Sequence, residues 1–490
     1  MTNYLQVLLI SCLCCATMAQ PPVIPSAWIT EAQGWYQDSL RINTADDPVP
    51  GREGPLLTYI ENILNNEGIP FILYNLPYGG GLSGTLLYAR LNGTTDEDVL
   101  MSSHSDTVTI SDMPAWEGLS GNIINGRIYG RGALDMKHKV IYDLATLVWT
   151  HRLGLTLERG LIYAVVPGEE IGVVGAFLCA VDPNCASLLS NVVIAFEEVG
   201  AMTFVAADGH EILPVSLGDK GPCFGSASIV KEAHHPAVWI PTDQLAILAL
   251  AQALVQLNEV IPVPHYTPVN LLLLDDLKRV SPQMRHLAEQ LRNPNRFQQT
   301  MEHVRETDIN LFKFLLPQFT HLKSTQSFSA AATSASSCAA DASSIIYMVP
   351  VPGDPNGCVT ALNEAIEAMD NPDINFSLFS VDIPPPLAGG AGMTIDPADP
   401  LIVEALSKIY DVTDTIMKNV TVVRAHCAAP TNDIMWHNLL GIPTVGFEPV
   451  RFPADTYYMD MFHGTNEWIP LASFVEGIQV HFEVMRRMST

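Results

Sequence analysis

The sequence predicts an α/β protein with a largely parallel sheet, and two observations carry this prediction. Short apolar segments bounded by Gly, Pro or Asn are typical of buried strands, and they cover residues 71–74, 85–91, 99–101, 161–166 and 192–196. Helix-like stretches, such as 55–66 and 139–153, alternate with these strands. Alternation of this kind favours strand–helix–strand units around a parallel sheet.

The pattern changes near Gly221, which indicates a second domain. A strand is expected at 224–230, a helix at 244–257, largely helical chain at 284–316 and another strand at 345–351. The Pro384-Pro385-Pro386 and Gly389-Gly390 cluster is typical of a linker. A helix at 400–409, a strand at 442–447 and a helix at 471–488 follow it. We therefore expect one α/β domain in two pieces, 20–221 and 384–490, with an α+β domain inserted at 222–383.

The N-terminus resembles a secretory signal. Residues 4–18 are apolar and uncharged, and Thr17-Met18-Ala19 resembles a small-residue cleavage site. The segment lacks Lys and Arg, and it is shorter than the roughly 20 residues that span a bilayer. We expect a signal peptide at 1–19 and a protein that is secreted or in the lumen of the secretory pathway; an uncleaved anchor is the alternative.

Cysteines and sequons agree with export. Cys179 and Cys185 lie close enough in sequence for a small disulfide loop, and two buried free thiols are the alternative. Asn92, Asn375 and Asn419 begin Asn-x-Ser/Thr sequons, which predict glycosylated surface positions in an exported chain.

The chain is strongly acidic, with 25 basic and 52 acidic residues and a net charge of −27. Such a surface repels phosphate backbones and anionic membranes, so we expect no nucleic-acid partner and no membrane association after signal cleavage. It is compatible with binding divalent cations.

Histidines and carboxylates gather just after the expected strands. His104 and Asp106 follow one strand, Glu169-Glu170 and Glu197-Glu198 follow two others, and Asp135 follows the Gly130-Arg131-Gly132 turn. Ligands of open α/β sheets bind at the carboxyl ends of the strands. Imidazole nitrogen and carboxylate oxygen suit a divalent metal, so these residues predict a metal site.

These motifs resemble the di-zinc amidohydrolases that include aminoacylase, carboxypeptidase S, carnosinase and acetylornithine deacetylase. The resemblance rests on four motifs and spans most of residues 50–485, and it is nearest to the secreted carboxypeptidase S-like branch. The motifs are His104-Ser105-Asp106-Thr107-Val108, Gly130-Arg131-Gly132-Ala133-Leu134-Asp135, Pro167-Gly168-Glu169-Glu170 and Phe462-His463-Gly464-Thr465-Asn466-Glu467. It implies a zinc-peptidase-like sheet flanked by helices, with the inserted domain as a lid that pairs two chains.

The resemblance also implies two divalent metal ions, most simply Zn²⁺. One would be held by His104, Asp135 and Glu197, with Glu198 as the lesser candidate in the same acidic motif. The other would be held by the shared Asp135 together with Glu170 and His463. Asp106 would orient the His104 imidazole, and a cis peptide is expected after Asp135.

For catalysis, the resemblance implies that Glu169 is the general base and that His235, from the lid, stabilises the oxyanion of a small amide or peptide substrate. A surface loop histidine is the alternative for His235, and His234 is its near neighbour. His138 is expected to face solvent. The Gly79–Gly84 spacing resembles a dinucleotide motif, but it leads into a strand and is interpreted as a hairpin-like turn.

Three substrate-handling positions depart from the family pattern. Ser336-Ser337-Cys338-Ala339 stands where relatives have Asn-Val-Ile-Pro. Val349 or a neighbour stands where they have one arginine, and Met435 lies near the position of another. An arginine suits a carboxylate through two hydrogen bonds, which Met cannot make. Arg424 or Arg451 is a candidate replacement. Two functions therefore stay open: a secreted amidohydrolase acting on small N-acyl amino acids or dipeptides, and a non-catalytic secreted binding protein that keeps the fold and the metal site but lacks the carboxylate clamp.

Overall fold

The computed structural model describes residues 22–490 except 47–50, 111–115, 199–201, 236, 332–337, 355, 380–389 and 391. The expected signal at 1–19 and most of the expected linker, Pro384 to Gly389, lie outside the described residues. Within them, no helix is both long enough and apolar enough to cross a membrane.

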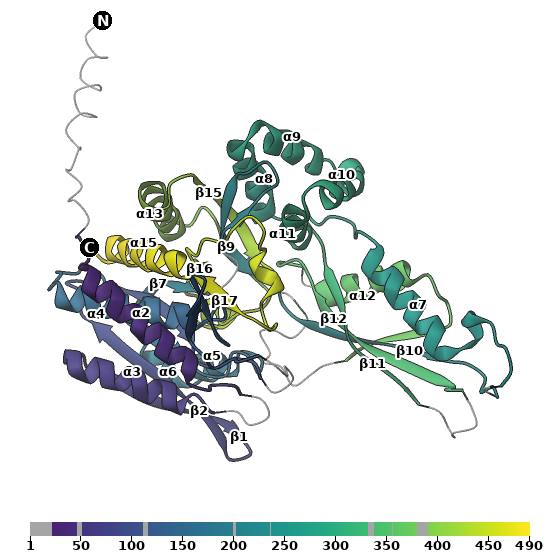
Figure 1. The fold of residues 1–490 in the computed structure, drawn as a ribbon, viewed down its shortest axis with the longest axis horizontal. Coiled ribbons are helices and arrows are strands. Elements are labelled where there is room, and N and C mark those ends of the chain that lie inside the picture. Colours follow the sequence, from purple (N-terminus) through teal and green to yellow (C-terminus); the bar gives the residue numbers. More distant parts are fainter. Residues whose placement is uncertain are drawn as a thin grey trace, which may run out of the picture.

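A ten-stranded sheet forms the centre of the larger domain (Figure 1), in the order β1-β2-β6-β3-β7-β16-β9-β14, with β8 and β15 also paired to β9. The neighbours β6, β3, β7 and β16 run parallel, as β15 and β9 do, whereas β1 and β2 at one margin are antiparallel. The α/β prediction is confirmed. The strands are β1 (Phe71–Gly79), β2 (Leu82–Leu91), β3 (Asp98–His104), β6 (Gly160–Val166), β7 (Val192–Glu197), β8 (Phe204–Val205), β9 (Glu211–Asp219), β14 (Met393–Thr394), β15 (Val420–Cys427) and β16 (Thr444–Gly446).

Helices cover both faces of this sheet. A small sheet of β4 (Asn122–Ile124), β5 (Arg127–Tyr129) and β17 (Trp468–Pro470) lies beside them. The helices are α2 (Ser26–Arg41), α3 (Gly54–Glu67), α4 (Lys137–Arg152), α5 (Val174–Val181), α6 (Pro183–Ser187), α13 (Pro400–Ile416), α14 (Asp433–Leu440) and α15 (Leu471–Ser489), with a short 3₁₀ turn η2 (Tyr458–Asp460).

Helix α4 corrects the expectation that His138 faces solvent. The helix packs between the sheet and helices α2 and α15, so residues 137–150 are all buried. His138 lies 3.3 Å from Glu448, and Lys139 forms a buried ion pair of 2.7 Å with Asp143. The polar side chains of this helix thus find partners inside the protein, some on the helix itself and some, such as Glu448, remote in sequence.

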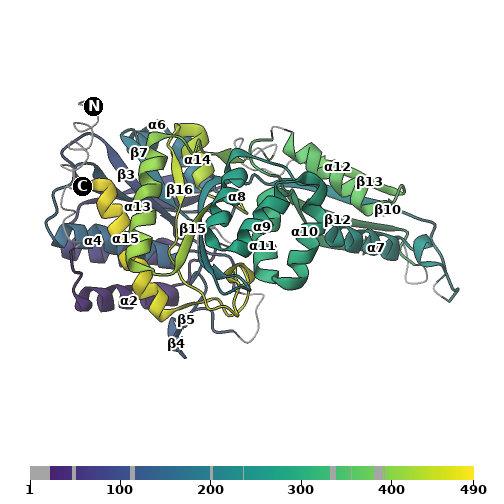
Figure 2. The ribbon, with the colours of Figure 1, turned by 90° about the horizontal axis from the view of Figure 1, so that it is seen from above.

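The lid domain has its own sheet, in the order β11-β12-β10-β13 (Figure 2). Its strands are β10 (Cys223–Val230), β11 (Leu322–Ala331), β12 (Asp341–Val349) and β13 (Ile374–Phe379), covered by α7 (Ala246–Glu259) and α12 (Gly357–Met369), with the 3₁₀ turn η1 (Thr242–Gln244) before α7. A separate apolar core joins these elements, including Ile229, Leu250 and Ile346. A disulfide between Cys223 and Cys358, which the sequence did not indicate, ties β10 to α12.

The inserted domain was expected to span 222–383, but this range also contains helices that belong to the larger domain. Four helices inside that range pack on the larger domain, above β9 and β15 (Figure 1), and share its apolar core through residues such as Leu273 and Phe319. They are α8 (Pro268–Val280), α9 (Pro282–Leu291), α10 (Pro294–Thr307) and α11 (Ile309–Phe319). The chain therefore leaves the larger domain near Gly221, returns to it before α8 and enters the lid again at β11.

Two local expectations are confirmed. Gly79, Gly80 and Gly81 all have positive φ and lie at the turn of the antiparallel β1–β2 hairpin, not in a nucleotide loop. Cys179 and Cys185 form a disulfide. Strand β1, however, is largely exposed rather than buried, because it is the edge of that hairpin.

Candidate metal centre

The carboxyl ends of three parallel strands supply one side of the site. Strand β3 ends at His104, β6 is followed by Glu169 and Glu170, and β7 is followed by Glu198. Because β6, β3 and β7 are neighbours in the sheet, their ends lie side by side. The loop before α4 brings Asp135, and the loop before β17 brings His463.

Asp135 stands between the two histidines. Its Oδ1 lies 3.0 Å from His104 Nε2, and its Oδ2 lies 3.0 Å from His463 Nε2. The same His104 nitrogen lies 3.0 Å from Glu198, and the same His463 nitrogen lies 3.1 Å from Glu170. One carboxylate is thus shared by two groups of ligand type, His104–Asp135–Glu198 and Asp135–Glu170–His463. The peptide after Asp135 is cis, as expected.

Glu198 takes the position that the sequence assigned to Glu197. Glu197 points the other way, where its carboxylate accepts hydrogen bonds from Ser102 Oγ and, at 3.0 Å, from Trp436 Nε1. The reason is geometric: β7 continues through Glu197, so successive side chains alternate in direction, and only Glu198 faces His104. The sequence therefore predicted the ligand of this acidic motif one residue too early in the chain.

Asp106 contacts the second ring nitrogen of His104, as expected, but mainly through its backbone carbonyl rather than its side chain. The His104 Nδ1 is 2.9 Å from the backbone carbonyl of Asp106 and 3.6 Å from its carboxylate. The carboxylate instead accepts hydrogen bonds from the backbone N–H groups of Glu169, at 3.1 Å, and Glu170, at 2.9 Å. Asp106 therefore positions the histidine through its backbone and the two glutamates through its side chain.

Glu467 is a residue whose role the sequence did not reveal, although it ends the His463 motif. It is fully buried, and its carboxylate accepts hydrogen bonds from the backbone N–H groups of Gly132, Leu134 and Asp135 and from the Arg131 side chain. It thus holds the whole turn that carries Asp135. Its spacing four residues after His463 is the only sequence signal.

The electrostatics of the site come from crowded, buried carboxylates. Burial raises the pKa of the Glu169 carboxyl well above its usual range, and the negative charge of Glu198 raises it further. Burial and Asp135 raise the pKa of Glu170 to about 7. Burial opposes ionisation of Asp135 too, but hydrogen bonds from His104 and His463 outweigh it and hold that pKa below its usual range.

The donor set fits divalent cations. Glu170 Oε1 is buried without a hydrogen-bond partner among the described residues, although a buried carboxylate oxygen ordinarily has one. Each of the two groups offers one imidazole and two carboxylates, a set suited to zinc and similar ions. Asp135 would then contact both ions.

Other predicted residues lie outside this cluster. His235 is exposed, follows β10 in the lid and forms no part of the two ligand groups. Met435 is buried in α14. Ser336 and Ser337 lie outside the described residues. The sequon residues Asn92, Asn375 and Asn419 are all exposed, and their glycosylation stays a prediction.

Both candidate replacement arginines are already paired. Arg424 makes two side-chain hydrogen bonds to Asp276, at 2.6 and 2.8 Å. Arg451 pairs with Glu211 at 2.6 Å and with Glu476 at 2.9 Å. Neither is among the residues around Asp135.

Comparison with known proteins assigns the family. The model of peptidase family M20/M25/M40 matches residues 100–487, so the chain belongs to this family. A succinyl-diaminopimelate desuccinylase of Rhodospirillum centenum is 35% identical over 24% of this chain and 30% of its own length. A protein of Talaromyces marneffei named as a probable carboxypeptidase is 29% identical over 36% of this chain and 38% of its own length. The matches thus span about a third of these curated relatives.

Solved structures share the fold across almost the whole chain. The M20 family metallo-carboxypeptidase Sso-CP2 of Sulfolobus solfataricus has a TM-score of 0.61 at 15% identity, covering 94% of this chain and 99% of its own. Human carnosine dipeptidase 1 has a TM-score of 0.62 at 13% identity, covering 94% and 97%. At such identities the likeness shows the fold alone.

Proposed function

We propose that the protein is a dinuclear metal-dependent amidohydrolase that cleaves the amide bond of small N-acyl amino acids or dipeptides. The observation that carries this proposal is the position of Asp135, 3.0 Å from each of two histidines, with a carboxylate of its own beside each histidine. Membership of a peptidase family supports the same reaction class.

The ions are proposed to be Zn²⁺, held by His104, Asp135 and Glu198 on one side and by Asp135, Glu170 and His463 on the other. When bound, a zinc pair supplies Lewis-acid activation of water and of the substrate carbonyl. Glu169 is the general base: it accepts a proton from the attacking water and passes it to the leaving amine. The position of Glu169 supports this role, because its carboxylate lies within 4.8 Å of ligand atoms of His104 and Glu170 and can therefore reach a water at the centre.

The substrate is proposed to be held without the family's arginine clamp. Arg424 and Arg451 are committed to Asp276 and to Glu211 and Glu476, and Met435 offers no donor. A free substrate carboxylate would therefore find no bidentate partner among them. Neutral or longer apolar acyl groups are the preferred class.

His235 is proposed to complete the site from a second copy of the chain. Support comes from its surroundings: Trp239 is 85% exposed and Val238 61% exposed, which is unusual for large apolar side chains near one another. A partner lid would cover them and carry His235 toward the other chain's metals. His235→Ala should then lower turnover without changing metal content, and His234→Ala is the matched control.

Mixing two inactive variants tests this arrangement. Glu169→Gln and His235→Ala chains, refolded together, should recover activity through hybrid dimers, because one hybrid site has both residues intact. No recovery from a mixture shown to contain heterodimers would contradict a shared site.

Secretion is proposed from the apolar N-terminus and the disulfides. Cys179–Cys185 and Cys223–Cys358 are of the kind that persists in oxidising compartments. N-terminal sequencing of protein recovered from the medium of expressing cells should begin near residue 20. Protein retained in cells with Met1 intact would contradict it.

An assay of mature protein tests the reaction. Protein stripped with chelator and reloaded with Zn²⁺, Co²⁺ or Mn²⁺ should hydrolyse members of a panel of N-acyl amino acids and dipeptides, and chelator should abolish this. Saturable ligand binding without turnover under every metal would instead favour the non-catalytic binding protein.

A further inference from the structure

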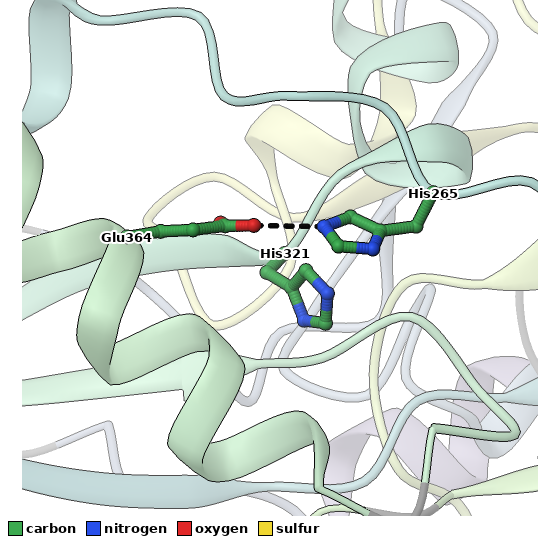
Figure 3. A group of neighbouring side chains, drawn as sticks. All are labelled: His265, His321 and Glu364. Atoms are coloured by element: carbon green, nitrogen blue, oxygen red, sulfur yellow. Dashed lines mark hydrogen bonds and ion pairs between the residues drawn. The ribbon is translucent and has the colours of Figure 1, made fainter.

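A second group of ligand-type side chains lies away from the metal centre, where the lid joins the larger domain (Figure 3). It consists of His265, His321 and Glu364, whose nearest ligand atoms all lie within 4.8 Å of one another. His265 precedes α8, His321 lies between α11 and β11, and Glu364 is on α12. The first two thus come from segments where the chain crosses between the domains.

The three side chains face each other. His265 Nε2 lies 2.7 Å from Glu364 Oε1, and the His321 ring stands perpendicular to that of His265 with 4.0 Å between centroids. Figure 3 shows His321 beside the line that joins the other two residues. One ring nitrogen of His321 therefore lies within 4.8 Å of the facing atoms of His265 and Glu364.

His321 is the informative member, because it is fully buried and neither ring nitrogen has a hydrogen-bond partner among the described residues. Leaving a buried polar group unpaired costs about 1–3 kcal/mol, so such a group calls for an explanation. A bound cation would give His321 the partner that it lacks among the described residues.

We propose that His265, His321 and Glu364 bind one divalent cation of the zinc type, separate from the two ions of the catalytic centre. Two imidazoles and one carboxylate are a common ligand set for zinc, and a fourth position can be filled by water. Zinc bonds of about 2.1 Å separate tetrahedral ligand atoms by roughly 3.4 Å. The 2.7 Å between His265 Nε2 and Glu364 Oε1 would have to widen, and the spacing to His321, at most 4.8 Å, would have to narrow by up to about 1.4 Å.

The surroundings leave room for that water. A pocket of about 560 Å³ reaches the group and is lined by His265, His321, Tyr266, Pro352 and Asp354. The ion would be reached from solvent along this pocket, since His265 retains 29% side-chain exposure.

Lys323 is the feature that opposes binding, and it sharpens the test. Its ammonium lies 2.7 Å from Glu364 Oε2, the oxygen that does not face His265. This ion pair keeps Glu364 ionised, which favours cation binding, but it also places a positive charge near the bound cation, which opposes it. The affinity for the cation should therefore depend on the balance of these two effects. Removing only that charge should strengthen cation binding.

An ion at this position would fasten the lid. Glu364 belongs to the lid, whereas His265 and His321 lie in the two connecting segments that join the lid to the larger domain. A cation shared by all three would restrict the orientation of the lid relative to the catalytic centre.

Zinc stoichiometry of the full-length protein tests the proposal. After equilibration at buffered zinc and gel filtration, elemental analysis should find one ion fewer per chain in His321→Gln and Glu364→Gln than in the unmodified protein. His286→Gln, which alters an exposed histidine of α9, is the matched control and should lose none. Lys323→Met should bind the same ion at least about tenfold more tightly in a competition titration with a chromogenic chelator.

The catalytic pair provides an internal reference, because ions lost through general unfolding would include it. Equal zinc content in all the variants, together with unchanged affinity in Lys323→Met, would overturn the proposal. A third ion that binds only at millimolar zinc, with an affinity that these substitutions do not change, would be an adventitious ion only and would also overturn the proposal. Failure of the hydrolase assay would leave the third ion in place, so the two proposals fail separately.

Discussion

Glu197 and Glu198 are adjacent in the chain, yet their carboxylates lie on opposite sides of the end of β7. Glu198 is 3.0 Å from the ring nitrogen of His104, whereas Glu197 accepts a 3.0 Å hydrogen bond from Trp436. The two residues share charge and burial but only one can reach a metal. The pair therefore offers a direct comparison of a ligand with a structural neighbour.

Glu198→Ala should remove one of the two catalytic ions and nearly all turnover, because it deletes a ligand. Glu197→Gln should keep both ions, since an amide can still accept the Trp436 hydrogen bond. Metal analysis of the purified variants checks this. Retention of both ions by Glu198→Ala, with loss of one from Glu197→Gln, would restore the assignment made from the sequence.

The sequence predicted the α/β fold and the ends of the strands that build the site, because hydrophobic strands and the residues that follow them are local features. His104 and Glu170 were found this way, Asp135 by the glycine-rich turn before it and His463 by the family resemblance, and all four do converge. The sequence could not predict which of Glu197 and Glu198 is the ligand, because the answer depends on the residue at which β7 ends and side chains stop alternating in direction. A shift of one residue reverses the direction of a strand side chain.

The predicted bounds of the inserted domain were wrong for another reason. Helices α8–α11 lie within the range assigned to the inserted domain, but their apolar faces pack on the larger domain. Amphipathic patterning shows that a helix has a buried face without showing what covers it. The same limit explains His138, whose partner Glu448 is remote in the sequence.

Glu467→Gln should weaken metal binding by about 10–100-fold, the usual effect of losing a group that orients ligands. The amide has one acceptor oxygen, whereas the carboxylate serves three backbone N–H groups and Arg131. Zinc affinity measured by competition titration checks this. Glu302→Gln, whose side chain is 47% exposed, is the control, and equal affinities in both variants would show that the Asp135 turn holds itself in place.

Substrate preference should differ from that of enzymes that grip a carboxylate. Amide-capped N-acyl amino acids should be cleaved within about tenfold of the corresponding free acids, because no bidentate arginine discriminates between them. The values of kcat/KM for matched capped and free substrates decide this. A large preference for the free acid, lost in Arg424→Gln or Arg451→Gln, would show that one of these arginines leaves its present partner.

Acidification should destabilise the protein through His426. Burial, with the charge of Lys220, lowers the pKa of this histidine to about 3, while the unfolded value is near 6.5. Between those values the unfolded chain binds more protons, so stability falls as pH falls. This histidine alone should cost about 2 kcal/mol between pH 7.5 and 5.

Urea unfolding of the unmodified protein and of His426→Gln measures the effect. Glutamine keeps a partner for Thr267, which lies 2.8 Å from His426 Nε2, but does not titrate. The variant should lose less stability on acidification, whereas the exposed His286→Gln should follow the unmodified protein. Parallel pH profiles for all three proteins would contradict the assignment.

The most direct test of the central claim, hydrolysis by a metal pair with Glu169 as its base, is turnover and metal content measured together in Glu169→Gln. The substitution preserves shape but removes the group that accepts the water's proton, so turnover should fall by about 10²–10⁴-fold while both ions remain bound. Loss of an ion would show Glu169 to be a ligand, and undiminished turnover with both ions bound would contradict the mechanism itself.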